Sequence, residues 1–224
     1  MELFLKSITN QPLKVIDKNI EENMYVPISI SSKNKELTFN VSSSKEWEKY
    51  IDSYLTNHKA KVAFGGYLET RNIYNRSAYF STENQRNIHL GIDFWCKVNT
   101  NVLSVLDGRI HSFKNNINYG DYGPTIIIEH QIDGNIFYSL YGHLSEQSIE
   151  NINIGDVVKR GEVIAQLGDS SINGDYAPHL HFQLIINMED YLGDYPGVSS
   201  KETLDFYKEN CPNPNLLLKL PNEI

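Results

Sequence analysis

The hydrophobic pattern divides the chain into a largely polar first quarter and a long region of short apolar runs. From Lys61 onward these runs have the length of strands, are rich in Val, Ile, Tyr and Phe, and are separated by Gly, Asn and Asp. The main runs cover residues 88–95, 101–113, 125–132, 135–141, 157–167 and 179–186. Asp107-Gly108, inside the second run, and Asp133-Gly134, between the third and fourth runs, are hairpin signals. Many short strands at regular spacing predict an all-β, mostly antiparallel core with few short helices.

The two flanks predict a small α/β extension and a short terminal helix. In the first flank, Leu37 to Val41 is strand-like, and Ser43 with Glu46 has the capping-box spacing that begins a helix, here running to about Leu55. In the tail, KETLDFYKEN indicates a helix that must end at Cys-Pro-Asn-Pro-Asn. We therefore predict three parts: an N-terminal extension of unknown role (1–62), a core (63–198), and a C-terminal helix and tail (199–224).

The composition limits the partners and the compartment. The 224 residues carry a formal net charge of −8 and no basic run, which argues against nucleic acid and anionic membranes as partners. No apolar run approaches the ~18 residues that span a bilayer. The first residues lack a secretory signal pattern, so we expect a cytoplasmic protein, or a periplasmic or extracellular one if a signal has been removed. Cys96 and Cys211 predict a disulfide only weakly, and the oligomeric state is not predicted.

The first candidate site is the motif His-Leu-Gly-Ile-Asp at residues 89–93. Alternate residues of a strand share a face, so His89 and Asp93 lie on one face and the apolar residues take the other. A straight strand would hold the two Cα atoms ~13 Å apart, which is long for one metal ion. We therefore predict either that the chain bends, which Gly91 makes inexpensive, or that His89 precedes the strand proper.

The second candidate site is Pro-His-Leu-His-Phe at residues 178–182. Strand alternation directs the side chains of His179 and His181 to one face, with their Cα atoms ~6.5 Å apart, and directs Leu180 and Phe182 into the core. Histidine is costly to bury without a partner, so two histidines on one face of a buried strand indicate a site. The alternative is an exposed edge strand on which both histidines are innocuous.

A third histidine, His143 in Tyr-Gly-His-Leu-Ser, follows a predicted strand and is well placed to face a cleft. A catalytic zinc ion needs three protein ligands and one open position. His89, Asp93 and one histidine of the His-x-His pair supply such a set, and the two remaining histidines could act in acid–base catalysis. Histidine and carboxylate ligands accept several divalent metals, so zinc is not the only candidate.

These three motifs, in this order, resemble the lysostaphin-type (LytM-like) zinc metallopeptidases, which include many peptidoglycan endopeptidases. The resemblance covers about residues 64 to 190 and also includes residues 105–109, 125–130 and 155–168. It implies one zinc ion per chain, bound by His89, Asp93 and His181. It also implies that His143 and His179 flank the metal-bound water and the substrate carbonyl. The implied activity is hydrolysis of a peptide bond in a peptide or peptidoglycan fragment.

The flanks GGYLETRNIY, GDYPGV and CPNPNLLL look more like a subgroup of these domains without a signal sequence. In that subgroup the domain also occurs fused to kinase-like and class III aminotransferase-like domains. Such a context implies a cytosolic protein and a substrate other than intact cell wall. One alternative is therefore a metal-dependent hydrolase of a small non-wall amide or peptide. A second alternative is a non-catalytic binding or regulatory module, which a metal content near zero would favour.

Several other polar residues have two interpretations. His58, His111 and His130 are expected to be surface or structurally satisfied histidines. The polar loop 169–175 either lines the cleft or is only a turn. Four residues before the metal motif either form a substrate wall or are an ordinary solvated face: Tyr67, Glu69, Arg71 and Tyr74.

Overall fold

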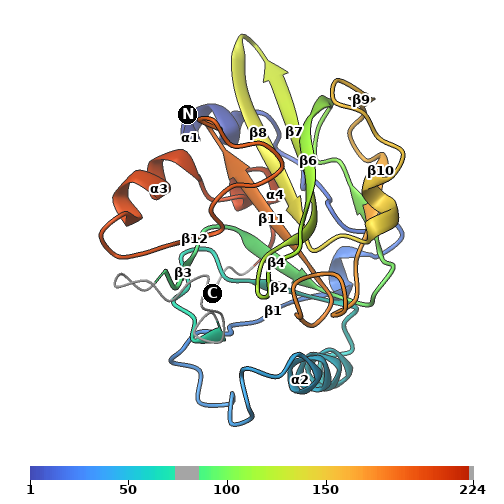
Figure 1. Cartoon of the computed structure of the whole chain (residues 1–224), viewed down its shortest axis with the longest axis vertical. Helices are drawn as coiled ribbons and strands as arrows, with labels where there is room; N and C mark the ends of the chain where they lie inside the picture. The colour runs from blue at the N-terminus through green and yellow to red at the C-terminus, as the bar shows by residue number, and fades with distance from the viewer. Residues whose placement is uncertain (74–85, 222–224) are drawn as a thin grey trace.

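The computed structural model describes residues 1–73 and 86–221, and it is built on one large sheet (Figure 1). The sheet has eight strands in the order β1-β2-β4-β11-β8-β7-β6-β9. Their bounds in that order are Tyr25–Pro27, Val62–Gly65, Ile92–Trp95, His179–Ile185, Asn135–Gly142, Gly123–Ile132, Gly108–Asn116 and Val157–Val158. β1 runs parallel to β2, whereas the other neighbours in the sheet pair antiparallel. The predicted all-β, mostly antiparallel core is therefore confirmed.

Two small sheets and a few short helices surround the large sheet. β10 (Val163–Gln166) pairs with β5 (Asn101–Leu103), and β12 (Val198–Ser199) pairs with β3 (Ile88–His89). The described residues include the α-helices α1 (Glu2–Ser7), α2 (Ser44–Asn57), α3 (Leu204–Asn210) and α4 (Asn215–Leu218), and 3-10 turns at Glu22–Met24 and Glu146–Ile149. Among the described residues, no helix is both long and apolar enough to cross a membrane.

The two Asp-Gly signals have different outcomes. Asp133-Gly134 joins β7 to β8 with φ angles of 49° and 79°, the positive values that a type I′ hairpin turn requires. Asp107-Gly108 does not form a hairpin, because it joins β5 to β6 and these strands lie in different sheets. The Asp107 carboxylate accepts a hydrogen bond from the backbone N–H of Arg160. The Asp107-Gly108 pair therefore lies where the chain passes from the small sheet of β5 and β10 to the large sheet.

The predicted first helix is present, but the predicted strand before it is not. The Ser43 side chain accepts a hydrogen bond from the N–H of Glu46 at the start of α2, as the capping pattern predicts. The Glu46 carboxylate accepts from the N–H of Asn40 at 2.8 Å. Leu37 to Val41 is not a strand, because the N–H groups of Leu37 and Thr38 bond to carbonyls two and three residues earlier and form local turns.

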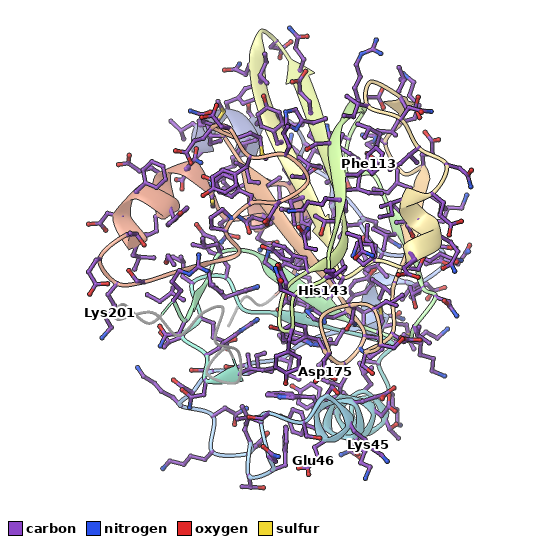
Figure 2. All side chains as sticks on the ribbon, in the orientation of Figure 1. Lys45, Glu46, Phe113, His143, Asp175 and Lys201 are labelled. Atoms are coloured by element: carbon purple, nitrogen blue, oxygen red, sulfur yellow. The ribbon has the colours of Figure 1, made fainter. Side chains whose placement is uncertain are left out.

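The N-terminal extension is hydrogen-bonded into the core. Beyond β1, the N–H of Ile28 donates to Phe64 and the N–H of Ser32 donates to Thr70. At the start of α2, the Ser44 hydroxyl donates to the Asp175 carboxylate at 2.5 Å, and Figure 2 shows Asp175 between α2 and His143. This helix therefore lies against the loop that precedes β11. The division of the chain into three parts stays a prediction.

Both ends of the chain contribute to the largest core cluster. It contains Leu5 and Ile16 from the first segment and Leu217 from α4, together with apolar residues of the sheet. α1 packs against α4; neither helix is predicted by the hydrophobic pattern, whereas α3 lies inside the predicted helical run of the tail. Cys96 and Cys211 are buried free thiols, so the weakly predicted disulfide is wrong.

Candidate metal centre

In the motif at residues 89–93, both alternatives that the sequence left open contribute: His89 precedes the strand that carries Asp93, and the chain bends between them. His89 ends β3 and Asp93 lies in β4, with Leu90 and Gly91 between the two strands. The bend brings Nε2 of His89 to 3.2 Å from Oδ1 of Asp93. Gly91 is not among the residues with positive φ. A Cβ atom at Gly91 would lie 2.7 Å from the ring of His181, so glycine is needed here for close approach of that ring rather than for an unusual backbone angle.

His181 completes a cluster with His89 and Asp93. β11 lies between β4 and β8, and its residue His181 is in register with Asp93. The Nδ1 atom of His181 lies 2.8 Å from Nε2 of His89 and 3.1 Å from Oδ1 of Asp93. His179 and His181 are 5% and 3% exposed. The alternative of two innocuous histidines on an exposed edge is therefore wrong, because the strand is central and both side chains are buried.

The hydrogen bonds around the cluster leave its centre without protons. Nδ1 of His89 donates to the carbonyl of Gly66, and Nε2 of His181 donates to Oε1 of Gln183, each at 2.9 Å. A neutral imidazole has one donor and one acceptor nitrogen, so a lone pair of each ring faces Asp93. Converging lone pairs repel one another unless a cation lies between them.

The spacing of the three atoms also suits a small cation. Ligands placed tetrahedrally at ~2.0–2.1 Å from a zinc ion lie roughly 3.3 Å apart, and the pairs here are separated by 2.8 to 3.2 Å. His89, Asp93 and His181 could thus hold a metal ion. The outward bonds to Gly66 and Gln183 orient the two rings, as second-shell acceptors do around protein-bound metals.

The charges around the cluster favour the protonation states that bind metals. Burial opposes ionisation of Asp93, but His89 and Arg71 outweigh it and hold its pKa well below the usual value. Burial and Arg71 lower the pKa of His89 to about 4. Arg71 donates from Nη1 to Asp93 and from Nε to Glu69 at 2.8 Å, and the hydroxyl of Ser29 donates to Glu69. A carboxylate and neutral imidazoles are the forms in which these ligands coordinate metals.

Two further imidazoles, those of His143 and His179, face the same pocket. Their ring centroids lie 4.2 Å apart. Nδ1 of His143 donates to the carbonyl of Asn173 at 2.8 Å, and Nδ1 of His179 donates to that of Ala177 at 2.7 Å. Nε2 of each ring makes no hydrogen bond to the described part of the chain. Burial lowers the pKa of both side chains, so each ring is a neutral proton acceptor.

The backbone at His143 is strained in a way that suits a functional position. His143 follows β8 with a φ angle of +64°, a left-handed conformation that is uncommon for residues other than glycine. Its N–H is held by the carbonyl of Tyr122 at 2.9 Å. Such strain persists where the surroundings fix it, and it clusters at active sites.

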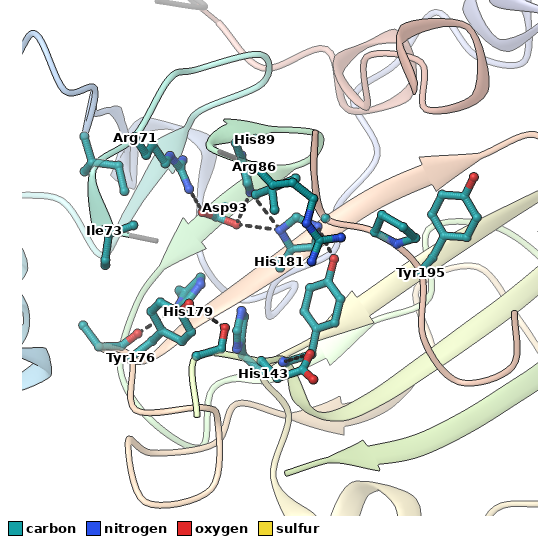
Figure 3. Close-up of a pocket in the computed structure, with 18 of the residues that line it drawn as sticks. Arg71, Ile73, Arg86, His89, Asp93, His143, Tyr176, His179, His181 and Tyr195 are labelled. Carbon is teal, nitrogen blue, oxygen red and sulfur yellow. Dashed lines mark hydrogen bonds and ion pairs between the residues drawn. The ribbon is translucent and has the colours of Figure 1, made fainter. Parts of the chain in front are cut away.

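All five residues line one pocket, shown in Figure 3. Its empty volume is about 930 Å³, which includes the solvent at its mouth. In Figure 3, Ile73 and Tyr176 lie on one side of the cluster and Tyr195 lies on the other. The pocket therefore has room for groups on both sides of a reacting bond.

The structure decides some of the alternative interpretations of the polar residues before the metal motif and in the loop 169–175. Arg71 lines the pocket and pairs with Glu69. Because Arg71 also donates to Asp93, we interpret this pair as orienting the Asp93 carboxylate rather than as a substrate wall. Tyr74 lies outside the described residues. The loop 169–175 holds His143 through Asn173. Gln183 is not among the residues predicted from the sequence, although it lies two residues after His181 on the same strand face, where strand alternation predicts it.

The three other histidines lie outside the pocket. His130 is buried and its ring is bonded to the carbonyl of Asp107 and to Ser139, so it is structurally satisfied as expected. His58 is exposed and bonds to the carbonyl of Tyr54, and His111 is half-buried against Ser112.

Comparisons with known proteins identify the region that carries the site. Residues 87–191 match the sequence profile of Peptidase family M23. The chain is 36% identical to lysostaphin from Staphylococcus staphylolyticus over 100 residues, which is 45% of this chain and 19% of the relative. It is 33% identical to the glycyl-glycine endopeptidase ALE-1 from Staphylococcus capitis over 135 residues, which is 60% of this chain and 31% of the relative.

Among solved structures, the catalytic domain of the antimicrobial peptidase lysostaphin from Staphylococcus simulans is 26% identical to this chain. The superposition covers 70% of this chain and 96% of that domain, with a TM-score of 0.41. The chain spans only between 19% and 31% of the length of the curated relatives named above. Asp93 and the four histidines of the pocket all lie inside the region matched by the family profile. Residues 87–191, which carry the metal cluster and both further imidazoles, are therefore the part of this chain that is similar to Peptidase family M23.

Proposed function

We propose that this chain is a zinc metalloendopeptidase that hydrolyses a peptide bond, with one zinc ion bound by His89, Asp93 and His181. The observation that carries the proposal is the convergence of three unprotonated donor atoms in a buried cluster, beside two neutral imidazoles in one pocket. Three protein ligands leave a position open, which is typical of catalytic rather than structural zinc sites.

The protein's own groups supply proton transfer and positioning. When bound, zinc supplies Lewis-acid polarisation of the scissile carbonyl and makes the attacking water more acidic. Nε2 of His143 or of His179 accepts the proton of that water, and the same proton passes to the leaving amine nitrogen. The second imidazole takes up a proton from solvent at Nε2 and donates it in a hydrogen bond to the oxygen on which charge develops. The backbone carbonyls of Asn173 and Ala177 keep both rings in the required tautomer.

The proposed substrates are peptides of the peptidoglycan type, supported by the relatives named lysostaphin and glycyl-glycine endopeptidase. A small amide or peptide unrelated to cell wall would use the same metal site, and activity on cell-wall fragments distinguishes the two. A non-catalytic binding module remains the third candidate, and it predicts protein that holds no metal.

The test is metal analysis of protein purified without chelator, with cleavage assays on purified peptidoglycan and on small glycine- or D-alanine-containing peptides. We expect about one zinc ion per chain, and loss of both metal and cleavage in His181→Ala. A His58→Ala variant, which changes an exposed histidine, should keep both. Zinc without cleavage of any wall peptide would move the substrate away from cell wall. Native protein without metal would contradict the catalytic proposal.

A further inference from the structure

The N-terminal extension contributes two side chains to the pocket that holds the metal cluster. Ile30, which follows β1, and Trp47, in the first turns of α2, both line it. Both lie outside the region that is similar to Peptidase family M23, which begins at residue 87. Their side chains are buried, with exposed fractions of 5% and 3%, so the extension closes the pocket at this point.

The indole of Trp47 is held in a fixed position. Its Nε1 donates to the carbonyl of Val41 at 2.8 Å, and its ring meets the edge of Phe39 at a centroid distance of 4.9 Å. The helix that carries it is attached to the loop before β11 by the bond from Ser44 to Asp175. An aromatic wall that is already ordered loses little conformational entropy when a ligand packs against it.

The wall that Ile30 and Trp47 complete is apolar and adjoins the proposed proton acceptor. Its other members are Ile73, Trp95, Ala177 and Val198. The Trp95 ring is stacked on that of His179, with centroids 5.8 Å apart and an interplanar angle of 20°. The Ala177 carbonyl holds the same imidazole. A group bound on this wall would therefore lie directly beside the reacting bond.

The pocket also has charged lining residues, among them Arg71, Arg86, Asp121 and Asp194. Burial raises the pKa of the Asp121 and Asp194 carboxyls. The pocket thus combines the apolar wall that the extension completes with charged groups, so different parts of a bound substrate meet different chemistry.

We propose that Ile30 and Trp47 complete an apolar subsite that binds a large aliphatic side chain next to the scissile bond. The chain would then prefer a residue such as leucine over glycine at that position, which favours the second substrate class given above, a peptide unrelated to cell wall. This inference rests on the proposed function and names the class of substrate that the site selects. Burial of a leucine side chain that glycine lacks corresponds to roughly a 10–100-fold difference in affinity.

The test measures binding of two probes that differ only in this side chain. Glycine hydroxamate and leucine hydroxamate both bind metal through the hydroxamate group and place the α-carbon substituent beside it. By titration calorimetry on zinc-loaded protein, we expect leucine hydroxamate to bind roughly 10–100-fold more tightly. The ratio should fall towards one in Trp47→Ala and should fall partly in Ile30→Ala. Tyr54→Ala removes an aromatic ring from the same helix but away from this pocket, and it should leave the ratio unchanged.

The possible results distinguish failure of the proposed subsite from failure of the proposed metal site. Equal binding of the two hydroxamates to the native protein would overturn the subsite and leave the proposed function intact. If the affinity ratio of the two hydroxamates falls as far in Tyr54→Ala as in Trp47→Ala, the subsite would also be overturned. The effect would then come from a change in the whole helix. Failure of both probes to bind, or binding that persists in His181→Ala, would overturn the proposed metal site and the subsite with it. If Trp47→Ala does not fold by circular dichroism, the ratio in Ile30→Ala decides.

Discussion

Two buried histidine environments in this molecule differ in whether the second ring nitrogen is bonded to the protein. His130 on β7 and His143 after β8 are both buried, and burial lowers the pKa of both, that of His130 to about 4. His130 donates from Nδ1 to the carbonyl of Asp107 and accepts at Nε2 from the hydroxyl of Ser139. His143 donates from Nδ1 in the same manner, but its Nε2 faces the pocket.

The difference shows that burial and a lowered pKa do not by themselves identify a functional histidine. A buried ring with both nitrogens bonded to the protein has nothing left to offer a substrate. A buried ring with one nitrogen directed into a pocket keeps a neutral acceptor available for proton transfer. His179 belongs with His143 in this respect. The predictions below alter one environment at a time.

The largest contrast is expected from truncation of one histidine in each environment. His179→Ala should reduce the rate of peptide cleavage by roughly 10²–10⁴-fold while the bound zinc stays near one per chain, because the ring is a proton acceptor and not a ligand in the proposed site. His130→Ala should keep the metal and the rate per folded molecule. It should lower the free energy of unfolding by roughly 2–4 kcal/mol, because a cavity forms and the Asp107 carbonyl loses its donor.

The measurements are the rate of cleavage, the metal content and urea unfolding on the same preparations. A His130→Ala variant that is stable but inactive would show that this ring has a part in the chemistry. A His179→Ala variant that loses its zinc would show that His179 is a metal ligand and not only a proton acceptor.

The second effect is the pH dependence of stability that His130 imposes. Its pKa is about 4 in the folded protein and ~6.5 in an unfolded chain. The unfolded state therefore binds the proton more readily, so the stabilisation is complete above pH ~6.5 and is lost as the pH falls towards 4. The full loss is roughly 3 kcal/mol.

The stability difference between wild type and His130→Ala should consequently narrow as the solution is acidified. Urea unfolding at intervals from pH 7 to pH 4 would measure it for both proteins. A difference that stays constant over this range would mean that His130 does not titrate between its folded and unfolded values. The buried histidines of the pocket are present in both proteins, so their contribution cancels in this comparison.

The smallest effect is expected at Arg71, which contacts neither His130 nor His143. This side chain donates to Asp93 and to Glu69 from different nitrogens, a fork that lysine cannot reproduce. Arg71→Lys should weaken zinc binding by roughly 10–100-fold, the effect typical of groups that orient a metal ligand. Competition with a chelator would measure the affinity, and Arg109→Lys, which changes an exposed arginine, should leave it unchanged. An unaltered affinity in Arg71→Lys would show that Asp93 needs no such support.

Local patterns in the sequence predicted the parts of this molecule that depend on neighbouring residues. Strand alternation predicted the shared face of His179 and His181, the turn chemistry predicted the hairpin at Asp133-Gly134, and the cap predicted α2. Each of these depends on the φ and ψ preferences of a few consecutive residues. The H-x-x-x-D spacing also required either a bend or a His89 that precedes the strand, because a straight strand is too long to bring both side chains to one point.

Tertiary structure alone decided which groups meet. It determined that Asp107-Gly108 crosses between sheets, that Gly91 makes room for His181, and that Trp47 of the extension lines the metal pocket. It also determined which nitrogen of each imidazole faces the cluster, since that depends on acceptors such as Gly66 that lie far away in the sequence. Contacts of this kind arise when the whole core packs, and no short stretch of residues encodes them.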